Sequence, residues 1–242
     1  MNLLAIETAT EACSVALLHA GTVRSRFEIA PRRHAELVLP WCEALLAEAG
    51  LGRGQLDAIA VGIGPGAFTG LRLAIAMGQG LALALDRPLI GVSSLQVLAA
   101  GARGAQPGDG VFAAIDARMG EVYAAAFRIH RDGLPEPEAA PQLAAPSQVQ
   151  VPEDSYGWAR GTGLAAGEAE LGARLQAQGW RLEPAALPAA EDLARLAARA
   201  YARGDYPQRP EYVQPLYLRD KVAQTTAERE AAAAAGSLQG RS

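Results

Sequence analysis

Residues 59–72, IAVGIGPGAFTGLR, decide the fold, because they read as a buried strand, a glycine-rich turn and the start of a helix. Glycine in such a turn lets the backbone come close to another group. Thr69 is placed to cap the helix, and the free N–H groups of a helix N-terminus can hold an anion. Two interpretations are open: the turn packs against its own lobe, or Gly64, Gly66, Thr69 and Gly70 face a cleft that receives a nucleotide.

On both sides of this stretch, apolar runs alternate with segments of helical periodicity, which is typical of an α/β protein. Pro31 and Gly50 suit the start and the end of the first helix, and Pro40 should bend it or shift its start. Ser93 or Ser94 is expected to cap the third helix. The first half is expected to contain strands at 3–6, 13–18, 23–29, 56–63 and 89–92 and helices at 31–49, 68–85 and 94–102.

The second half begins with the same pattern, because Ile115-Asp116 ends a strand before a hairpin as Ile6-Glu7 does. The repeat predicts two related lobes. Glu7 and Asp116 either face the cleft between the lobes or are polar residues at strand ends. We expect an N-terminal lobe at 1–105 with partner-binding helices, a smaller C-terminal lobe at 106–220 and a flexible tail at 221–242. The elements expected beyond a linker at 101–110 are strands 111–115, 122–129 and 156–161, helices 165–177 and 191–202, and an irregular excursion at 134–146.

The helix at 68–85 is apolar on all sides, because Arg72 and Gln79 are the two polar residues from Leu71 to Leu85. A helix of this kind must be covered on all sides. Its small residues recur four apart, which permits close approach of another helix. They form two rows, Gly70, Ala74, Gly78 and Ala76, Gly80, Ala84. Burial inside the lobe and contact with a second chain are both open interpretations.

The helix at 31–49 has two apolar stripes, which together are too wide for one core-facing side. One stripe could pack on the sheet while the other contacts a second chain. Trp41 is either an anchor of that contact, since aromatic residues dominate interface energetics, or an ordinary core residue. The stripes are Leu37, Trp41, Leu45 and Leu39, Cys42, Leu46, Ala49. The expected partner surface comprises Leu37, Trp41, Leu45, Leu71, Ala74, Gly78 and Leu81.

Composition argues against several classes of protein. The 242 residues carry a net charge of −4, whereas a protein that grips RNA alone usually has a basic face. If the chain acts on RNA, a partner protein should supply most of the contacts that bind the RNA. The most apolar segment, 73–85, is too short to span a bilayer, and residues 1–6 lack the basic start and long apolar stretch of a signal peptide. We therefore expect no signal peptide and a cytoplasmic protein without a membrane partner. Cys13 and Cys42 are expected to be buried, reduced thiols.

Residue spacing argues against metal and phosphate chemistry. The three histidines, His19, His34 and His130, have no ligand spacing, so no metal site is expected. Neither cysteine has a plausible histidine partner nearby in sequence, which disfavours a peptidase. The first hairpin, Glu7-Thr8-Ala9, has no glycine, and the Cβ of Ala9 hinders close approach of a phosphate. We expect no catalytic residue and no cofactor.

Five segments together resemble the TsaB family, in the order in which that family has them. The glycine-rich segment 64–72 is specific by itself, and the others support it: 4–17, which is similar to the first hairpin, 34–40, 116–123 and 215–219. The resemblance implies two lobes of the actin, sugar kinase and Hsp70 type. It also implies pairing with TsaD, a paralogous transferase subunit, through the two long helices of the first lobe.

The role that the resemblance implies is that of a non-catalytic partner subunit. With TsaD and the ATPase TsaE, such a subunit serves the formation of threonylcarbamoyladenosine beside the anticodon of tRNAs that read codons beginning with A. It would meet tRNA through the complex and could also form a homodimer. His34 stands where the catalytic paralogue has the first of two metal-binding histidines, but Val38 replaces the second. The alternatives are an actin-fold ATPase or small-molecule kinase, and a peptidase acting on TsaD.

Overall fold

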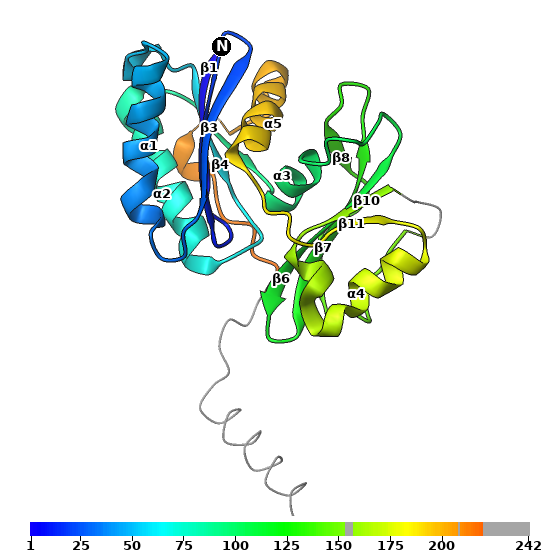
Figure 1. Ribbon diagram of the computed structural model, residues 1–242. Helices are drawn as coiled ribbons and strands as arrows, with labels where there is room; N and C mark the ends of the chain where they lie inside the picture. Colours follow the sequence, from blue (N-terminus) through cyan, green and yellow to red (C-terminus); the bar gives the residue numbers. More distant parts are fainter. Residues whose placement is uncertain (153–156, 208, 220–242) are drawn as a thin grey trace, which may run out of the picture.

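A computed structural model describes residues 1–152, 157–207 and 209–219, which form two lobes, each built on one mixed β-sheet (Figure 1). The first sheet has the order β3-β2-β1-β4-β5. Its first three strands are antiparallel neighbours, and β1, β4 and β5 run parallel. The strands are β1 Asn2–Glu7, β2 Ala12–His19, β3 Thr22–Ile29, β4 Ala58–Gly62 and β5 Leu89–Val92.

Helices cover both faces of the first sheet. On one face lie α1 (His34–Glu48) and α2 (Phe68–Leu85), which meet a core that includes Ile6, Val15 and Ile59. On the other face lies α5 (Ala190–Arg203), packed on Leu3, Ala5 and Ala16 (Figure 1). The parallel strands β1 and β4 are buried on both faces, which explains their unbroken apolar runs at 3–6 and 58–61.

The second sheet has the order β11-β10-β6-β7-β8, with β9 paired to β7. The helix α4 (Ala166–Ala177) covers one of its faces and α3 (Ser94–Ala100) the other. Both α3 and α5 therefore lie between the two sheets (Figure 1). The strands are β6 Gly110–Arg118, β7 Glu121–Ile129, β8 Pro135–Pro137, β9 Gln142–Ala144, β10 Gly157–Arg160 and β11 Arg181–Glu183, and the short 3₁₀ turns are η1 Arg53–Gln55, η2 Thr162–Ala165 and η3 Pro210–Tyr212.

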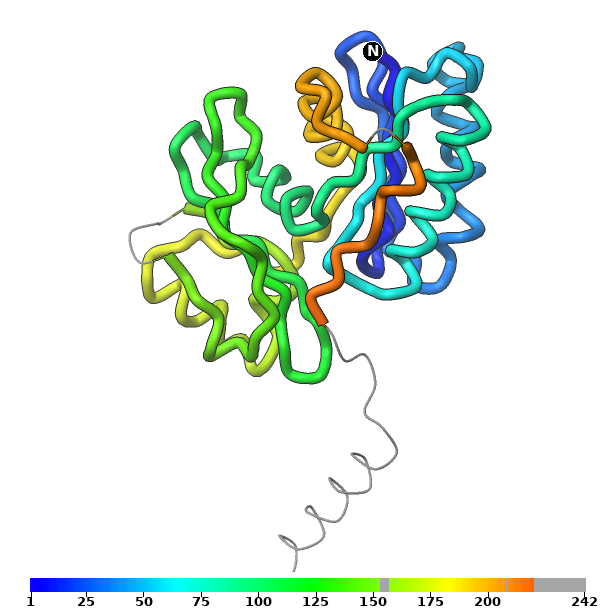
Figure 2. The backbone as a smooth tube through the Cα atoms, turned by 180° about the vertical axis from the view of Figure 1, so that it is seen from behind, coloured from blue at the N-terminus to red at the C-terminus, as the bar shows by residue number. Residues whose placement is uncertain are grey.

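The predicted two-lobed α/β fold is confirmed. The structure differs from the predicted lobe boundary, because parts of the range 106–220, which is assigned to the second lobe, return to the first lobe. Helix α5 belongs to the first lobe, because its buried face packs on β1 and β2. The segment 209–219 also returns there and runs beside α2 (Figure 2). The side-chain amide of Gln79 donates hydrogen bonds to the carbonyl oxygens of Pro210 (3.3 Å) and Val213 (3.1 Å). The predicted tail at 221–242 lies outside the described residues.

Several local predictions are wrong. The excursion at 134–146 contains β8 and β9, and the strand β11 was not expected. Helix α2 begins at Phe68 with Ala67 as its N-cap, so Thr69 lies in the first turn and does not cap it. At 18 residues, α2 is long and apolar enough to cross a membrane by length and composition, contrary to the expectation from 73–85. Its packing along the first sheet identifies it instead as a helix of the lobe.

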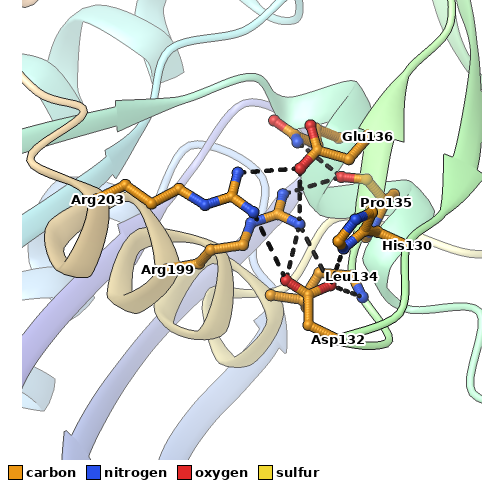
Figure 3. Close-up of polar contacts among 8 residues, drawn as sticks. His130, Asp132, Leu134, Pro135, Glu136, Arg199 and Arg203 are labelled. Atoms are coloured by element: carbon orange, nitrogen blue, oxygen red, sulfur yellow. Dashed lines mark hydrogen bonds and ion pairs between the residues drawn. The ribbon is translucent and has the colours of Figure 1, made fainter.

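A clasp of four charged residues joins the lobes beside α5 (Figure 3). Arg199 and Arg203 come from α5, and Asp132 and Glu136 come from the second lobe. The guanidinium of Arg199 lies 3.2 Å from Glu136 and 3.4 Å from Asp132, and it donates a 3.0 Å hydrogen bond to the carbonyl oxygen of Pro135. Arg203 lies 3.1 Å from Glu136. This clasp holds the second lobe against a helix of the first.

Candidate functional site

A cavity of about 900 Å³ opens between the lobes at the N-terminus of α2. The first lobe contributes the start of α1, the turn after β1 and the glycine-rich segment, and the second lobe contributes the hairpin after β6. The segment 216–219 closes one side. The polar and aromatic lining residues are Thr10, Glu11, Arg32, His34, Phe68, Thr69, Asp116, Arg118, Tyr123, Thr162, Tyr217 and Arg219.

The glycine-rich segment packs against the turn that follows β1. The N–H of Ala67 donates a 2.7 Å hydrogen bond to the carbonyl oxygen of Ala9, and the hydroxyl of Thr8 donates a 2.8 Å hydrogen bond to the carbonyl oxygen of Gly70. A Cβ at Gly66 would collide with Ala9, and one at Gly70 would collide with the carbonyl oxygen of Thr8. These glycines therefore admit the backbone of the chain's own turn, which is the first of the two interpretations.

Glu7 ends β1 inside the lobe and does not line the cavity. Its Oε1 accepts a 2.8 Å hydrogen bond from the N–H of Ala9, and its Oε2 accepts a 3.0 Å hydrogen bond from the hydroxyl of Ser94. Gly62 leaves room for the carboxyl group, because a Cβ there would collide with it. Burial raises the pKa of Glu7 from 4.5 to about 7, against the lowering effect of its hydrogen bonds. Gly64 is also buried and away from the cavity wall.

Asp116 does line the cavity, but its own hairpin engages its carboxylate. Oδ1 accepts a 2.7 Å hydrogen bond from the N–H of Arg118, and Oδ2 lies 2.9 Å from the guanidinium of the same residue. The N–H of Asp116 donates to the hydroxyl oxygen of Thr162 at 3.1 Å. Of the six predicted cleft residues, the structure brings Gly66, Thr69, Gly70 and Asp116 to the cavity and leaves Glu7 and Gly64 outside it.

The segment 216–219 brings residues to the cavity that sequence reasoning did not select. Arg219 forms an ion pair with Glu121 at 2.6 Å. The ring of Tyr217 lies 6.2 Å from that of Phe68, and the guanidinium of Arg72 lies 3.3 Å from the centre of the Phe68 ring. The sequence feature that could have pointed to these residues is the closing motif at 215–219. That motif indicated the family but did not predict that the segment lies beside the cavity.

The side chain of His34 forms hydrogen bonds with backbone carbonyl groups. Its Nε2 lies 3.1 Å from the carbonyl oxygen of Thr10 and 3.2 Å from that of Ala12, so Nε2 must carry the proton and donate it. The contact fixes the start of α1 against the first hairpin. Within the described ranges 1–152, 157–207 and 209–219, no three histidine, cysteine, aspartate or glutamate side chains cluster as metal ligands would.

The two cysteines are free thiols buried in the first lobe. Burial raises the pKa of Cys13 to about 11 and that of Cys42 to about 12. Both thiols are therefore protonated at neutral pH, and a nucleophilic role is disfavoured because the thiolate is the reactive form.

Four residues of the predicted partner surface are buried inside the first lobe and do not form an exposed face: Leu45, Ala74 and Gly78 lie against the first sheet, and Leu71 lies against Gly64 beside the cavity. Leu37, Trp41 and Leu81 are half-buried and pack on the edge of that core. The name α1–α2 face is used here for these three together with exposed Leu39, Ala76, Gly80, Leu83 and Ala84; other exposed positions of the two helices carry charged residues, including Glu36, Glu43 and Arg72.

The two rows of small residues in α2 have different environments. The row of Gly70, Ala74 and Gly78 is buried, with Gly70 against the turn after β1 and the other two against the sheet, and the row of Ala76, Gly80 and Ala84 is exposed. A Cβ at Gly78 would meet Val61 at 2.5 Å, whereas one at Gly80 would meet nothing within 4 Å. Leu39 is 44% exposed and Leu83 is 60% exposed, so large apolar side chains accompany the outer row. Burial inside the lobe therefore applies to the inner row, whereas contact with a second chain stays a prediction for the outer row.

Comparison with known proteins gives concordant matches in sequence and structure. The family model for TsaD, tRNA N6-adenosine threonylcarbamoyltransferase, matches residues 26–227. The chain is 41% identical over 226 residues to the tRNA threonylcarbamoyladenosine biosynthesis protein TsaB of Escherichia coli (strain K12), covering 92% of this chain and 96% of that protein. It is 44% identical over 123 residues to the protein of the same name from Haemophilus influenzae, covering 51% of this chain and 52% of that protein. The solved structure of YeaZ from Pseudomonas aeruginosa superposes with a TM-score of 0.80 and 43% identity, covering 90% of this chain and 99% of that one.

Proposed function

Since the chain belongs to the TsaB family and so takes part in tRNA threonylcarbamoyladenosine biosynthesis, we propose that it does so as a non-catalytic subunit that binds a TsaD-type transferase. The α1–α2 face is the observation that carries this proposal. Exposed apolar side chains and small residues on adjacent helices suit close packing against helices of a second chain. In this proposal TsaE joins the complex, tRNA is met through it, and the chain works in the cytoplasm.

The non-catalytic role is supported by the turn that follows β1. Actin-type kinases hold phosphates with an Asp-x-Gly hairpin, and the equivalent Glu7-Thr8-Ala9 has no glycine. Here the turn at Thr8 and Ala9 is itself packed into the glycine-rich segment. Glu7 is buried behind that turn. This arrangement disfavours the ATPase or kinase alternative, and the raised thiol pKa values disfavour a cysteine peptidase acting on TsaD.

A matched pair of substitutions tests the proposed surface. Ala76→Glu places a charge on the α1–α2 face, and Ala173→Glu places the same charge on an exposed position of α4 in the second lobe. Because a buried unpaired charge costs several kcal/mol, roughly 10²-fold or more in affinity, Ala76→Glu should abolish co-purification with the cognate TsaD. Ala173→Glu should leave it unchanged.

Two outcomes would contradict the proposal. If a folded Ala76→Glu variant still binds TsaD, the partner uses another surface. If the isolated wild-type chain turns over ATP or cleaves TsaD, the subunit is an enzyme. Trp41→Glu is a second probe of the same face, whereas Leu45→Glu would unfold the lobe because Leu45 is buried in its core. Sedimentation of the isolated chain and of Ala76→Glu tests whether the face also supports a homodimer.

A further inference from the structure

Helix α2 begins without a cap of its own. Its N-cap residue is Ala67, which has no hydrogen-bonding side chain, so the first turn is held from outside. The holding contacts come from the turn after β1, through Thr8 and Ala9. The turn is fixed in turn by the carboxyl group of Glu7, which accepts a hydrogen bond from the N–H of Ala9. The chain of contacts thus runs from Glu7 through the turn to the first residues of α2.

A second set of contacts starts from the same carboxyl group. The hydroxyl of Ser94 donates to Glu7 at 3.0 Å and accepts from the N–H of Gly64 at 3.3 Å. The N–H of Ser94 donates to the carbonyl oxygen of Gly64 at 2.8 Å. Of the two serines expected at the start of α3, Ser93 is the N-cap residue, without a side-chain capping hydrogen bond, and Ser94 is the first helical residue. The hydroxyl of Ser94 links the glycine-rich segment to Glu7. One buried carboxyl group therefore fixes both the start of the glycine-rich segment and the turn that packs on its end.

We propose that Glu7 is a positioning residue for partner binding: through Ala9 and Ser94 it fixes the glycine-rich segment, and so sets where the first turn of α2 lies beside the cavity and the α1–α2 face. This inference rests on the proposed function. Phe68, in that first turn, is 45% exposed, carries Arg72 on its ring and lines the cavity. A shift of the turn would move the wall of the cavity and the end of the partner-binding helix together.

The protonation state of Glu7 affects the hydrogen bonds that its carboxyl group accepts. The groups that donate to it, the backbone N–H groups of Ala9 and Thr8 and the hydroxyl of Ser94, are all uncharged. No titratable side chain in the described part of the chain is among the groups that shift its pKa. A protonated carboxyl group can donate one hydrogen bond and must then give up an accepting position, so the hydrogen bonds from Ala9 and Ser94 depend on its charge. The contact between the turn and the glycine-rich segment should follow the titration of Glu7.

Hydrogen exchange and partner affinity of the full chain test the proposal. Glu7→Ala should raise amide exchange about ten-fold or more across residues 64–71, leave exchange in α4 unchanged, and weaken TsaD binding about ten-fold. Glu7→Gln keeps an accepting oxygen and should restore most of the affinity. After correction for intrinsic exchange, protection of 64–71 should change between about pH 6 and about pH 8 in the wild type and stay flat in Glu7→Gln.

The outcomes separate this inference from the function on which it rests. Unchanged exchange at 64–71 in a folded Glu7→Ala variant overturns it, and so does an equal pH response in Glu7→Gln. If Glu7→Ala does not fold, Ser94→Ala removes the hydroxyl contacts with Glu7 and with the N–H of Gly64 and should raise exchange at 66–71, and no change there overturns the inference as well. If the wild-type chain does not bind TsaD at all, the proposed function fails, while the exchange measurements still decide the role of Glu7.

Discussion

The hydroxyl oxygen of Ser14 accepts a 3.0 Å hydrogen bond from the backbone N–H of Ala190, which lies 176 positions later in the chain. Ala190 is the first residue of α5, and its N-cap, Ala189, offers no side-chain acceptor. A serine of β2 therefore does the work of a helix cap across the core. The same hydroxyl donates to the carbonyl oxygen of Arg26 at 3.1 Å, so it also ties β2 to β3.

Ser14→Ala should lower the free energy of unfolding by about 1–2 kcal/mol, because it leaves the buried N–H of Ala190 without an acceptor. Chemical denaturation followed by circular dichroism measures this change. Ser25→Ala, at an exposed position of β3, is the matched control and should change stability by less than about 0.5 kcal/mol. Equal losses in the two variants would contradict the capping role.

Alanine at the two central glycines of α2 should have effects of opposite sign. Gly78→Ala puts a methyl group 2.5 Å from Val61 and 3.0 Å from Leu89, so it should destabilise the lobe by about 1–3 kcal/mol. Gly80→Ala meets open space and should stabilise the isolated chain by up to about 1 kcal/mol, because alanine favours a helix. Thermal unfolding of both variants checks the signs, and a stable Gly78→Ala would mean that the helix lies farther from the sheet.

Breaking the clasp of Figure 3 should loosen the second lobe from α5. The side chain of Arg199 is 12% exposed and contacts Asp132, Glu136 and the carbonyl oxygen of Pro135. Arg199→Met removes the charge-assisted hydrogen bonds of a largely buried guanidinium and should cost about 1–2 kcal/mol, because the two carboxylates, each 38% exposed, still pair with Arg203. Arg53→Met breaks an exposed pair with Glu43 and should cost less than about 1 kcal/mol. Similar losses in both variants would show that the clasp contributes no more than a surface pair.

The raised pKa of Glu7 makes stability fall as the pH rises. Between 4.5 and about 7 the folded state keeps a proton that the unfolded state has lost, so the free energy of unfolding decreases across this window and stays lower above it. The full effect corresponds to about 3 kcal/mol. Glu7→Gln should remove this component, as denaturation at a series of pH values will show. Glu170→Gln, an exposed carboxyl of α4, should keep the wild-type slope, and a Glu7→Gln slope equal to wild type would contradict the burial of the charge.

Much of the fold could be predicted because local patterns and long-range contacts agree. Apolar runs bounded by glycine and proline located β4, α2 and β5 to within a few residues, and the hairpin at Asp116 revealed the second lobe. The lobe boundary could not be predicted, because nothing local in the sequence of α5 says which sheet its apolar face will meet. The short strands β8, β9 and β11 have three residues each, too few for a periodic signal.

The site was predicted less well, because spacing along a helix does not say which side faces the sheet. Leu45 and Leu39 both belong to apolar stripes of α1, yet one is buried and the other exposed. For the glycine-rich segment, the sequence showed that something approaches closely but not whether it is a ligand or the chain itself. That answer depends on Thr8 and Ala9, which lie about sixty residues earlier, in the turn of the first hairpin.

Helix α5 has a consequence for the order of events during translation. Leu3, Ala5 and Ala16 stay uncovered until late in synthesis, because α5, the helix that packs on them, ends at Arg203. Until then the nascent chain exposes an apolar face of the first sheet, to which chaperones can bind and through which nascent chains can aggregate. The first lobe to begin folding is thus among the last parts to be finished, and a stop codon before Ala190 would yield an aggregating fragment rather than a working half.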